Sequence, residues 1–311
     1  MSKNLLVLTD CGENVPTFDP EFNVTALPVD ASFVQRISAI RDAEIIIGEP
    51  TLEELKHAHS LKWLQMTWAG ADRYLHGGFP SGVSLTTASG AFGQTIAEHS
   101  LALILALARR LPSYARSRKW EDLGGEKRLY GTTALIYGCG DIGSHIATLL
   151  KSFQIRTVGV CRNPRKPRKN FDILTTLDSA ELFFSEAELV ICALPHSEDT
   201  CGYFCEERLA ALRNDCIFVN VGRGSLVDTQ SLCRLLAKGK FFGVGLDVVD
   251  PEPLPDKHPL RNYSNVILTP HVAGIGFGHL KDTEDKIWAI CKNNLRRYLA
   301  GEPLENQVIF P

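Results

Sequence analysis

Three ionisable residues, an arginine, a glutamate and a histidine, each follow a stretch of sequence that reads as a β-strand. They are Arg223, Glu252 and His271. A guanidinium fork pairs with carboxylates, and an imidazole transfers protons near neutral pH. Taken singly, Arg223 could form a surface ion pair, Glu252 between two prolines could end a strand, and His271 could be a satisfied structural residue. In this order, at the carboxyl ends of strands where open α/β sheets build their sites, they favour catalysis.

A glycine-rich turn, Gly138-Cys-Gly-Asp-Ile-Gly143, lies between a strand-like segment and an apolar helix. In such a turn Gly138 permits the tight bend, Gly140 lets the backbone approach a pyrophosphate, and Gly143 lets the helix pack close to the strand. The N-terminus of the helix offers free N–H groups and partial positive charge to the phosphates. A chance glycine turn is the alternative, and the flanking strand and helix favour dinucleotide binding.

A basic segment follows the next predicted strand, at the position that sets dinucleotide specificity. Residues 162–169 hold five basic residues and no acid, whereas NAD sites usually place Asp or Glu there. The segment, with Arg162 first, could hold the 2′-phosphate of NADP. A solvated basic loop and a nuclear-localisation-like patch are the alternatives. The position of the segment favours NADP (NADPH) over NAD.

Strand and helix signals alternate along the chain, which predicts parallel sheets with helices on both faces. In the first hundred residues, strands are expected at 5–8, 45–47 and 61–67, and helices at 32–41 and 51–57, the latter capped by Thr51. A long helix is expected over 94–110 and should stop at Pro112. Later strands are expected at 133–137, 157–161, 189–194, 216–221, 243–248 and 266–269, and later helices at 142–152 and 282–299. We expect the last helix to return to the first domain.

Composition excludes several classes of protein. A length of 311 residues suggests two domains, and a net charge of −3 gives no reason to expect nucleic acid or an anionic membrane as a partner. The nine cysteines are scattered and odd in number, which favours a reducing, cytoplasmic setting and makes a zinc site improbable. The N-terminus lacks the features of a signal peptide. The apolar run over residues 101–108 is far shorter than the roughly 20 residues of a membrane span.

Several ordered motifs resemble those of the D-isomer-specific 2-hydroxyacid dehydrogenase family. They lie at residues 64–72, 96–99, 138–143, 193–200, 218–224, 245–253 and 268–274. The resemblance implies an α/β fold of two Rossmann/flavodoxin-like parallel-sheet domains with an interdomain cleft. Residues 1–95 plus 280–311 would form the substrate-binding domain, and residues 96–279 the dinucleotide-binding domain. The family also suggests a homodimer to which residues 112–130 contribute.

The resemblance assigns roles to the ionisable residues. Arg223 would bind the substrate carboxylate and polarise its carbonyl, and His271 would be the general acid in reduction and the general base in oxidation. Glu252 would pair with the imidazolium and favour its charged form. Backbone N–H groups near Ala69 and Gly70 would complete the carboxylate site. Dinucleotide contacts would come from Gly138, Gly140, Asp141, Ile142, Gly143, Arg162, Asn163, Pro195, Thr200, Val221, Asp247 and Gly274.

The function implied is NAD(P)-dependent reduction of a small 2-keto acid to the D-2-hydroxy acid, with glyoxylate and hydroxypyruvate fitting the NADP-like signature. A dinucleotide-sensing corepressor of the same fold is the alternative, because such relatives retain the catalytic residues. Formate dehydrogenases carry an amide where Glu252 stands and are disfavoured, whereas a phosphite dehydrogenase stays open. His99 is expected to make a structural hydrogen bond, and His196 to lie near the dinucleotide without transferring protons.

Overall fold

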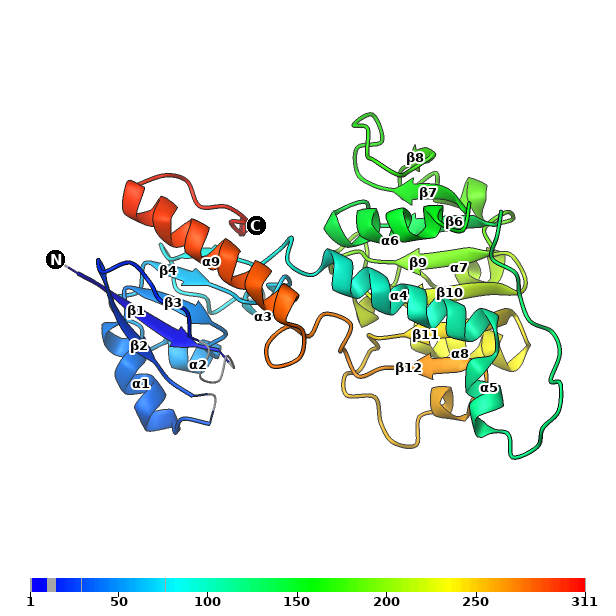
Figure 1. Ribbon diagram of the computed structural model, residues 1–311, viewed down its shortest axis with the longest axis horizontal. Coiled ribbons are helices and arrows are strands. Elements are labelled where there is room, and N and C mark those ends of the chain that lie inside the picture. Colours follow the sequence, from blue (N-terminus) through cyan, green and yellow to red (C-terminus); the bar gives the residue numbers. More distant parts are fainter. Residues whose placement is uncertain (1, 10–14, 29, 76, 311) are drawn as a thin grey trace. The chain divides into compact units, whose positions relative to one another are not determined.

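The computed structural model describes residues 2–9, 15–28, 30–75 and 77–310 (Figure 1). The chain divides into two compact units. Unit 1 comprises Met1–Phe92 and Ile275–Pro311, and unit 2 comprises Gly93–Gly274. Each unit is built on a parallel β-sheet, which confirms the predicted α/β class with two parallel-sheet domains.

Unit 1 contains a five-stranded sheet in the order β2-β1-β3-β4-β5, with every neighbouring pair parallel. The central strand β3 is buried along its whole length, as the unbroken apolar run 45–47 predicts for a strand covered on both faces. The strands are β1 (Lys3–Leu8), β2 (Phe22–Ala26), β3 (Ile45–Gly48), β4 (Trp63–Gln65) and β5 (Ser84–Thr86).

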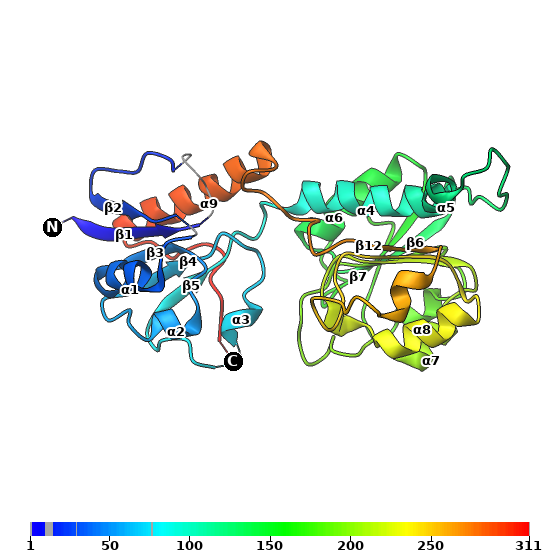
Figure 2. The ribbon, with the colours of Figure 1, turned by 90° about the horizontal axis from the view of Figure 1, so that it is seen from below.

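Helices cover both faces of this sheet, α9 on one and α1 and α2 on the other (Figure 2). Thr51 caps α2 as predicted: its hydroxyl accepts from Glu54 N at 3.2 Å, and the Glu54 carboxylate accepts from Thr51 N at 2.7 Å. This reciprocal pair satisfies two amides that the helix leaves free. The helices of unit 1 are α1 (Phe33–Asp42), α2 (Leu52–Leu55), α3 (Asp72–Leu75) and α9 (Lys281–Ala300).

The C-terminal helix α9 is anchored on the first unit by a ring contact and a buried amide. Tyr298 stacks on Trp63 with ring centroids 5.4 Å apart, and Asn294 Nδ2 donates to Gln65 Oε1 at 2.8 Å. Asn294 and Gln65 are fully buried, so this hydrogen bond satisfies groups that water does not reach. The sheet of unit 1 is thus covered by a segment some two hundred residues away in sequence.

Unit 2 contains a seven-stranded parallel sheet in the order β12-β11-β10-β9-β6-β7-β8. The chain reverses its direction of travel across the sheet between β6 and β9, and doubly wound sheets bind ligands at such a switch point. The strands are β6 (Thr133–Tyr137), β7 (Arg156–Val160), β8 (Ile173–Thr175), β9 (Leu189–Cys192), β10 (Cys216–Asn220), β11 (Phe241–Leu246) and β12 (Val266–Leu268).

Helices α4 and α6 cover one face of this sheet, and α7 and α8 cover the other (Figure 2). Pro112 does not stop the long helix as expected. Instead, α4 ends at Ala108, Arg110 takes a left-handed φ of 52°, and Pro112 lies in the first turn of α5, where proline is tolerated. The helices are α4 (Gly93–Ala108), α5 (Leu111–Arg116), α6 (Asp141–Lys151), α7 (Glu206–Ala211) and α8 (Thr229–Ala237), with short 3₁₀ turns at Ala180–Phe183, Gly224–Leu226 and Pro259–Asn262.

The apolar run over residues 101–108 belongs to α4, which packs against β10, β11 and β12. Its apolar side chains are therefore used within unit 2. Across the part of the chain that the structure describes, no helix combines the length and the apolar character that crossing a membrane requires.

Candidate active site

The three predicted ionisable residues lie at the carboxyl ends of strands that are neighbours, or near neighbours, in the sheet. Arg223 follows β10, Glu252 lies in the loop after β11, and His271 follows β12, with β11 between the other two strands. Asn220 closes the turn before Arg223, because its Oδ1 accepts from Gly222 N at 3.0 Å and its Nδ2 donates to the Arg223 carbonyl at 2.9 Å. The Arg223 Nη1 donates to the Gly222 carbonyl at 2.7 Å, which orients the guanidinium.

Glu252 and His271 form a direct pair. The Nδ1 of His271 lies 2.9 Å from Glu252 Oε2, and Glu252 Oε1 accepts from Val249 N at 3.0 Å. Both side chains remain accessible, with 51% of His271 and 37% of Glu252 exposed. Because the carboxylate engages Nδ1, Nε2 is the ring nitrogen that would be left for proton transfer. The pairing implied by the resemblance is present, whereas the catalytic roles stay a prediction.

The glycine loop has the close contacts that its sequence predicts. Gly138 has φ of 99°, and a Cβ there would lie 2.7 Å from the Ala193 carbonyl oxygen. A Cβ at Gly143 would lie 1.7 Å from the Gly138 carbonyl oxygen, so only glycine fits where the helix passes the strand. A Cβ at Gly140 would meet no described atom within 4 Å, and Gly140 precedes α6 without a side-chain cap. The open space and the uncapped helix N-terminus fit a pyrophosphate.

One basic residue of the segment 162–169 contacts the glycine loop, and it is not the one that the sequence singled out. Arg168 Nη1 donates to the Cys139 carbonyl at 2.6 Å, and its buried Nε has no partner among the described residues. Arg162, by contrast, is exposed at the end of β7. A guanidinium with an unsatisfied N–H beside the loop also fits a phosphate. Nothing in the spacing distinguishes Arg168 from its basic neighbours.

The remaining predicted dinucleotide residues lie along the same sheet edge. Thr200 Oγ1 donates to the Pro195 carbonyl at 2.9 Å in the loop after β9, and Asn163 Oδ1 accepts from Arg165 N at 3.1 Å after β7. Asp141 and Ile142 lie in the first turn of α6, Val221 is buried after β10, Asp247 follows β11 with 2% of its surface exposed, and Gly274 is the last residue of unit 2. Their contacts with a dinucleotide stay a prediction.

The two histidines set aside by the sequence analysis both have hydrogen-bond partners. His196 Nδ1 lies 2.8 Å from Ser225 Oγ, and His99 Nε2 lies 3.0 Å from Thr269 Oγ1. The structural hydrogen bond expected of His99 is thereby confirmed. Its partner Thr269 was not foreseen, because the two residues are 170 positions apart.

The predicted carboxylate-binding backbone, Ala69 and Gly70, lies in unit 1 in the loop after β4. A carboxylate from the neighbouring loop holds the residues just before it: Glu49 Oε1 accepts from Thr67 N at 2.6 Å and from Trp68 N at 3.2 Å. Burial raises the pKa of the Glu49 carboxyl to about 7, and the hydrogen bonds from Thr67 and Trp68 partly oppose the rise. The loop that the sequence connects with the substrate is thus held by an acid that titrates near neutral pH.

Glu49 should make the stability of the protein fall as pH rises from about 4.5 to about 7, relative to Glu49→Gln. The folded state binds the Glu49 proton more tightly than the unfolded state, so ionisation costs stability, by at most about 1.4 kcal/mol per pH unit. Tyr74 and Cys291 both interact electrostatically with Glu49. Burial raises the pKa of each, so neither titrates in this window. Denaturant unfolding at stepped pH measures the difference.

The control is Glu53→Gln on the surface of the neighbouring helix. Its hydrogen bond to Lys56 lowers the pKa of Glu53, so its contribution is lost only at more acidic pH. The difference in free energy of unfolding between wild type and Glu53→Gln should therefore stay constant from about pH 4.5 to about pH 7, whereas the difference for Glu49→Gln should change with pH. A flat or opposite slope for Glu49→Gln would show that the carboxyl is ionised throughout the window.

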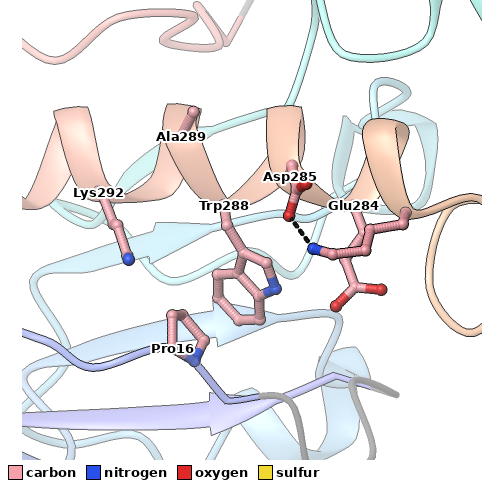
Figure 3. Close-up of a pocket in the computed structure, with 7 residues that line it drawn as sticks. Pro16, Glu284, Asp285, Trp288, Ala289 and Lys292 are labelled. Atoms are coloured by element: carbon pink, nitrogen blue, oxygen red, sulfur yellow. Dashed lines mark hydrogen bonds and ion pairs between the residues drawn. The ribbon is translucent and has the colours of Figure 1, made fainter.

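A pocket of about 420 Å³ in unit 1 lies between α9 and Pro16 (Figure 3). Its lining brings Trp288 together with both signs of charge, including Lys281 and Asp285 paired at 2.8 Å. None of the predicted site residues lines it. The balanced charge favours no single class of ligand, so the sheet edge of unit 2 is the better candidate for chemistry.

The chain is similar in sequence and in structure to known proteins. Residues 101–273 match the family model described as "D-isomer specific 2-hydroxyacid dehydrogenase, NAD binding domain". Glyoxylate reductase from Pyrococcus furiosus is 32% identical over 234 residues, which are 71% of this chain and 67% of that protein. A D-isomer specific 2-hydroxyacid dehydrogenase family protein from Aeromonas salmonicida has a solved structure with a TM-score of 0.88 and 29% identity, covering 100% of both chains. One from Xanthobacter autotrophicus, solved with NADPH and MES, has a TM-score of 0.82 and 25% identity, covering 99% of this chain and 98% of that one.

Proposed function

The chain belongs to the D-isomer-specific 2-hydroxyacid dehydrogenase family, and from this premise we propose that it reduces a small 2-keto acid to the D-2-hydroxy acid, preferably with NADPH. The family supports an oxidoreductase that uses a nicotinamide dinucleotide. The observation that carries the proposal is the His271–Glu252 pair, 2.9 Å apart, on the sheet edge that also bears Arg223 and the glycine loop.

The residues of this edge divide the chemistry among them. A bound nicotinamide dinucleotide supplies the hydride. Arg223 binds the substrate carboxylate through its planar fork and stabilises the negative charge that grows on the keto oxygen. His271 gives its Nε2 proton to that oxygen, while Glu252 at Nδ1 holds the ring in orientation and balances the imidazolium charge.

The test is oxidation of NADPH and NADH by the purified protein against a panel of 2-keto acids. The panel includes glyoxylate, hydroxypyruvate, pyruvate, 2-ketoisocaproate and phenylpyruvate. Turnover supports the reaction class and ranks the substrates. Measurable dinucleotide binding with no turnover of any 2-keto acid would instead favour the dinucleotide-sensing alternative, and turnover of phosphite alone would favour that substrate.

The preference for NADPH rests on the basic segment after β7, and the Xanthobacter relative that was solved with NADPH supports it. Arg162→Asp should lower the ratio of kcat/KM for NADPH over NADH by about 10- to 100-fold, because a charged hydrogen bond to the 2′-phosphate is lost and a repulsive charge replaces it. Steady-state kinetics with both dinucleotides measures the ratio.

Arg156→Asp is the matched control, since Arg156 starts the same strand at its opposite end and pairs with Glu186 at 2.9 Å. It should leave the NADPH/NADH ratio unchanged. If Arg162→Asp also left the ratio unchanged, Arg162 would not bind the 2′-phosphate, and Arg168 in the same segment would become the residue to test.

The segment between α5 and β6 supports the further proposal of a homodimer. Trp120 has 105% of its reference surface exposed and Tyr130 is 54% exposed, so two large aromatic side chains of this segment lack cover. Trp120→Asp should raise the dimer dissociation constant by about 30-fold or more, as loss of a buried aromatic anchor does. Sedimentation velocity over a concentration series measures this change.

Leu182→Asp is the matched control, because Leu182 is 78% exposed elsewhere on unit 2. The control should sediment as the wild type does. A Trp120→Asp variant that dimerises as tightly as the wild type would remove Trp120 from the interface.

We also propose that the protein works in the cytoplasm. The eight cysteines that the structure describes are free, which suits a reducing compartment. The expected result is that alkylation of freshly lysed cells, followed by mass spectrometry, finds the cysteines of this protein as free thiols.

A further inference from the structure

The backbone of His271 has a conformation that needs support. Its φ is 57°, in the left-handed region that only a few per cent of non-glycine residues adopt. Residues in such conformations persist only where their surroundings hold them, and they gather at functional sites. The question is therefore which groups hold His271, the proposed proton donor, in this conformation.

Asp247 contacts three successive amides beginning at His271. Its backbone carbonyl accepts from His271 N at 2.8 Å, its Oδ1 accepts from Val272 N at 3.0 Å, and its Oδ2 accepts from Ala273 N at 3.0 Å. The Asp247 side chain is 2% exposed, so these hydrogen bonds are made away from water. The turn that presents the imidazole is thus held by the backbone and the buried carboxylate of Asp247, with the Thr269 carbonyl also accepting from His271 N at 3.0 Å.

A chain of two further side chains holds that carboxylate. Thr269 Oγ1 donates to Asp247 Oδ1 at 2.6 Å, and His99 Nε2, on α4, lies 3.0 Å from Thr269 Oγ1. A hydroxyl has one hydrogen, and Thr269 gives it to Asp247, so His99 must be the donor to Thr269. The distance of 3.7 Å from His99 Nε2 to Asp247 Oδ1 is too long for a hydrogen bond, so Thr269 is the link.

We propose that His99 and Thr269 are positioning residues for the reaction: they hold Asp247, which holds the His271 turn in the conformation that delivers the proton. The proposal rests on the proposed function, since it concerns the proton step of that reaction. It also fixes a chemical state, because His99 must carry its hydrogen on Nε2. If the His99–Thr269 contact served only to hold α4 against β12, its loss would not affect the proton step. The donor order from His99 to Thr269 to Asp247 would then be of no consequence for the reaction.

The first experiment compares Thr269→Val with Thr269→Ser. Valine keeps the shape and removes the hydroxyl, so the buried Asp247 carboxylate loses a donor. We therefore expect kcat to fall about ten-fold. The dissociation constant for the dinucleotide should be unchanged. Serine keeps the hydroxyl and should return kcat to within about two-fold of the wild type. Thr157→Val is the matched control: Thr157 is also fully buried and donates to the Asn170 carbonyl at 2.7 Å, and its loss should lower stability without changing kcat.

The second experiment asks whether His99 acts through Thr269. His99→Ala should lower kcat by about three- to ten-fold. The double variant with Thr269→Val should be no slower than Thr269→Val alone, since removal of the link already disconnects His99. Losses that multiply in the double variant, an unchanged kcat in His99→Ala, or no recovery in Thr269→Ser would each overturn the proposal.

A third measurement does not depend on turnover. Nitrogen-15 NMR of histidine-labelled wild-type protein should show His99 protonated at Nε2, with His99→Ala used only to assign the signal. A neutral ring protonated at Nδ1 would remove the link even if the protein is an active reductase. Conversely, protein that reduces no 2-keto acid but has the Nε2 proton would refute the proposed function and the catalytic purpose of the chain, while the hydrogen-bond order would stand.

Discussion

His271→Ala should lower kcat for reduction of the 2-keto acid by roughly 10²- to 10⁴-fold, the range that a positioned acid–base group contributes. In the proposed mechanism the pair with Glu252 leaves Nε2 to deliver the proton, and alanine has no group that could do so. The dissociation constant for NADPH should stay near that of the wild type, because the glycine loop lies after β6 and is unchanged. Steady-state kinetics measures kcat, and fluorescence titration with NADPH measures the dissociation constant.

His271→Asn separates loss of the imidazole from loss of the backbone conformation. Asparagine tolerates a left-handed φ far better than most residues, so the turn at φ 57° should persist, yet it has no proton to transfer near neutral pH. Both variants should therefore be similarly slow. The exposed His59→Ala is the control and should turn over normally. Wild-type kcat in either His271 variant would remove His271 from the proton step.

The strands at the centre of each sheet were predictable because they are short, continuous apolar runs. β3, β6, β9 and β10 are almost entirely buried, and burial on both faces requires such runs. The strands β2, β5 and β8 were not predicted. They lie at sheet edges and have three to five residues, several of them accessible, so their sequences carry little apolar signal.

The candidate site was predictable to the extent that parallel strands place their carboxyl ends together. That rule brings Arg223 and His271 to one edge without knowledge of their contacts. It could not identify Thr269 and His99, because their contact requires the orientation of α4 on the sheet and joins residues 170 positions apart. It also favoured Arg162 over Arg168, since the path of an irregular segment decides which of its basic residues reaches the glycine loop.

Arg223→Lys should lower kcat/KM for the 2-keto acid by about 10²- to 10³-fold, although it preserves the positive charge. Removal of one donor to a developing oxyanion has an effect of this size. Lysine offers a point charge on a flexible stem, whereas the guanidinium presents paired N–H groups in a fixed plane to a carboxylate. Arg223 Nη1 also donates to the Gly222 carbonyl at 2.7 Å, a contact that fixes the plane of the fork and that a lysine cannot reproduce together with substrate binding.

The loss should appear in both KM for the 2-keto acid and kcat, because Arg223 is proposed to bind the carboxylate and to stabilise the keto oxygen. Arg213→Lys is the matched control: Arg213 pairs with Glu188 at 3.3 Å and is a surface arginine of the same unit. It should keep wild-type kinetics. A loss confined to KM would limit Arg223 to substrate binding and leave His271 as the main group acting on the keto oxygen, whereas wild-type kinetics in Arg223→Lys would mean that charge alone, without the fork, suffices for this substrate.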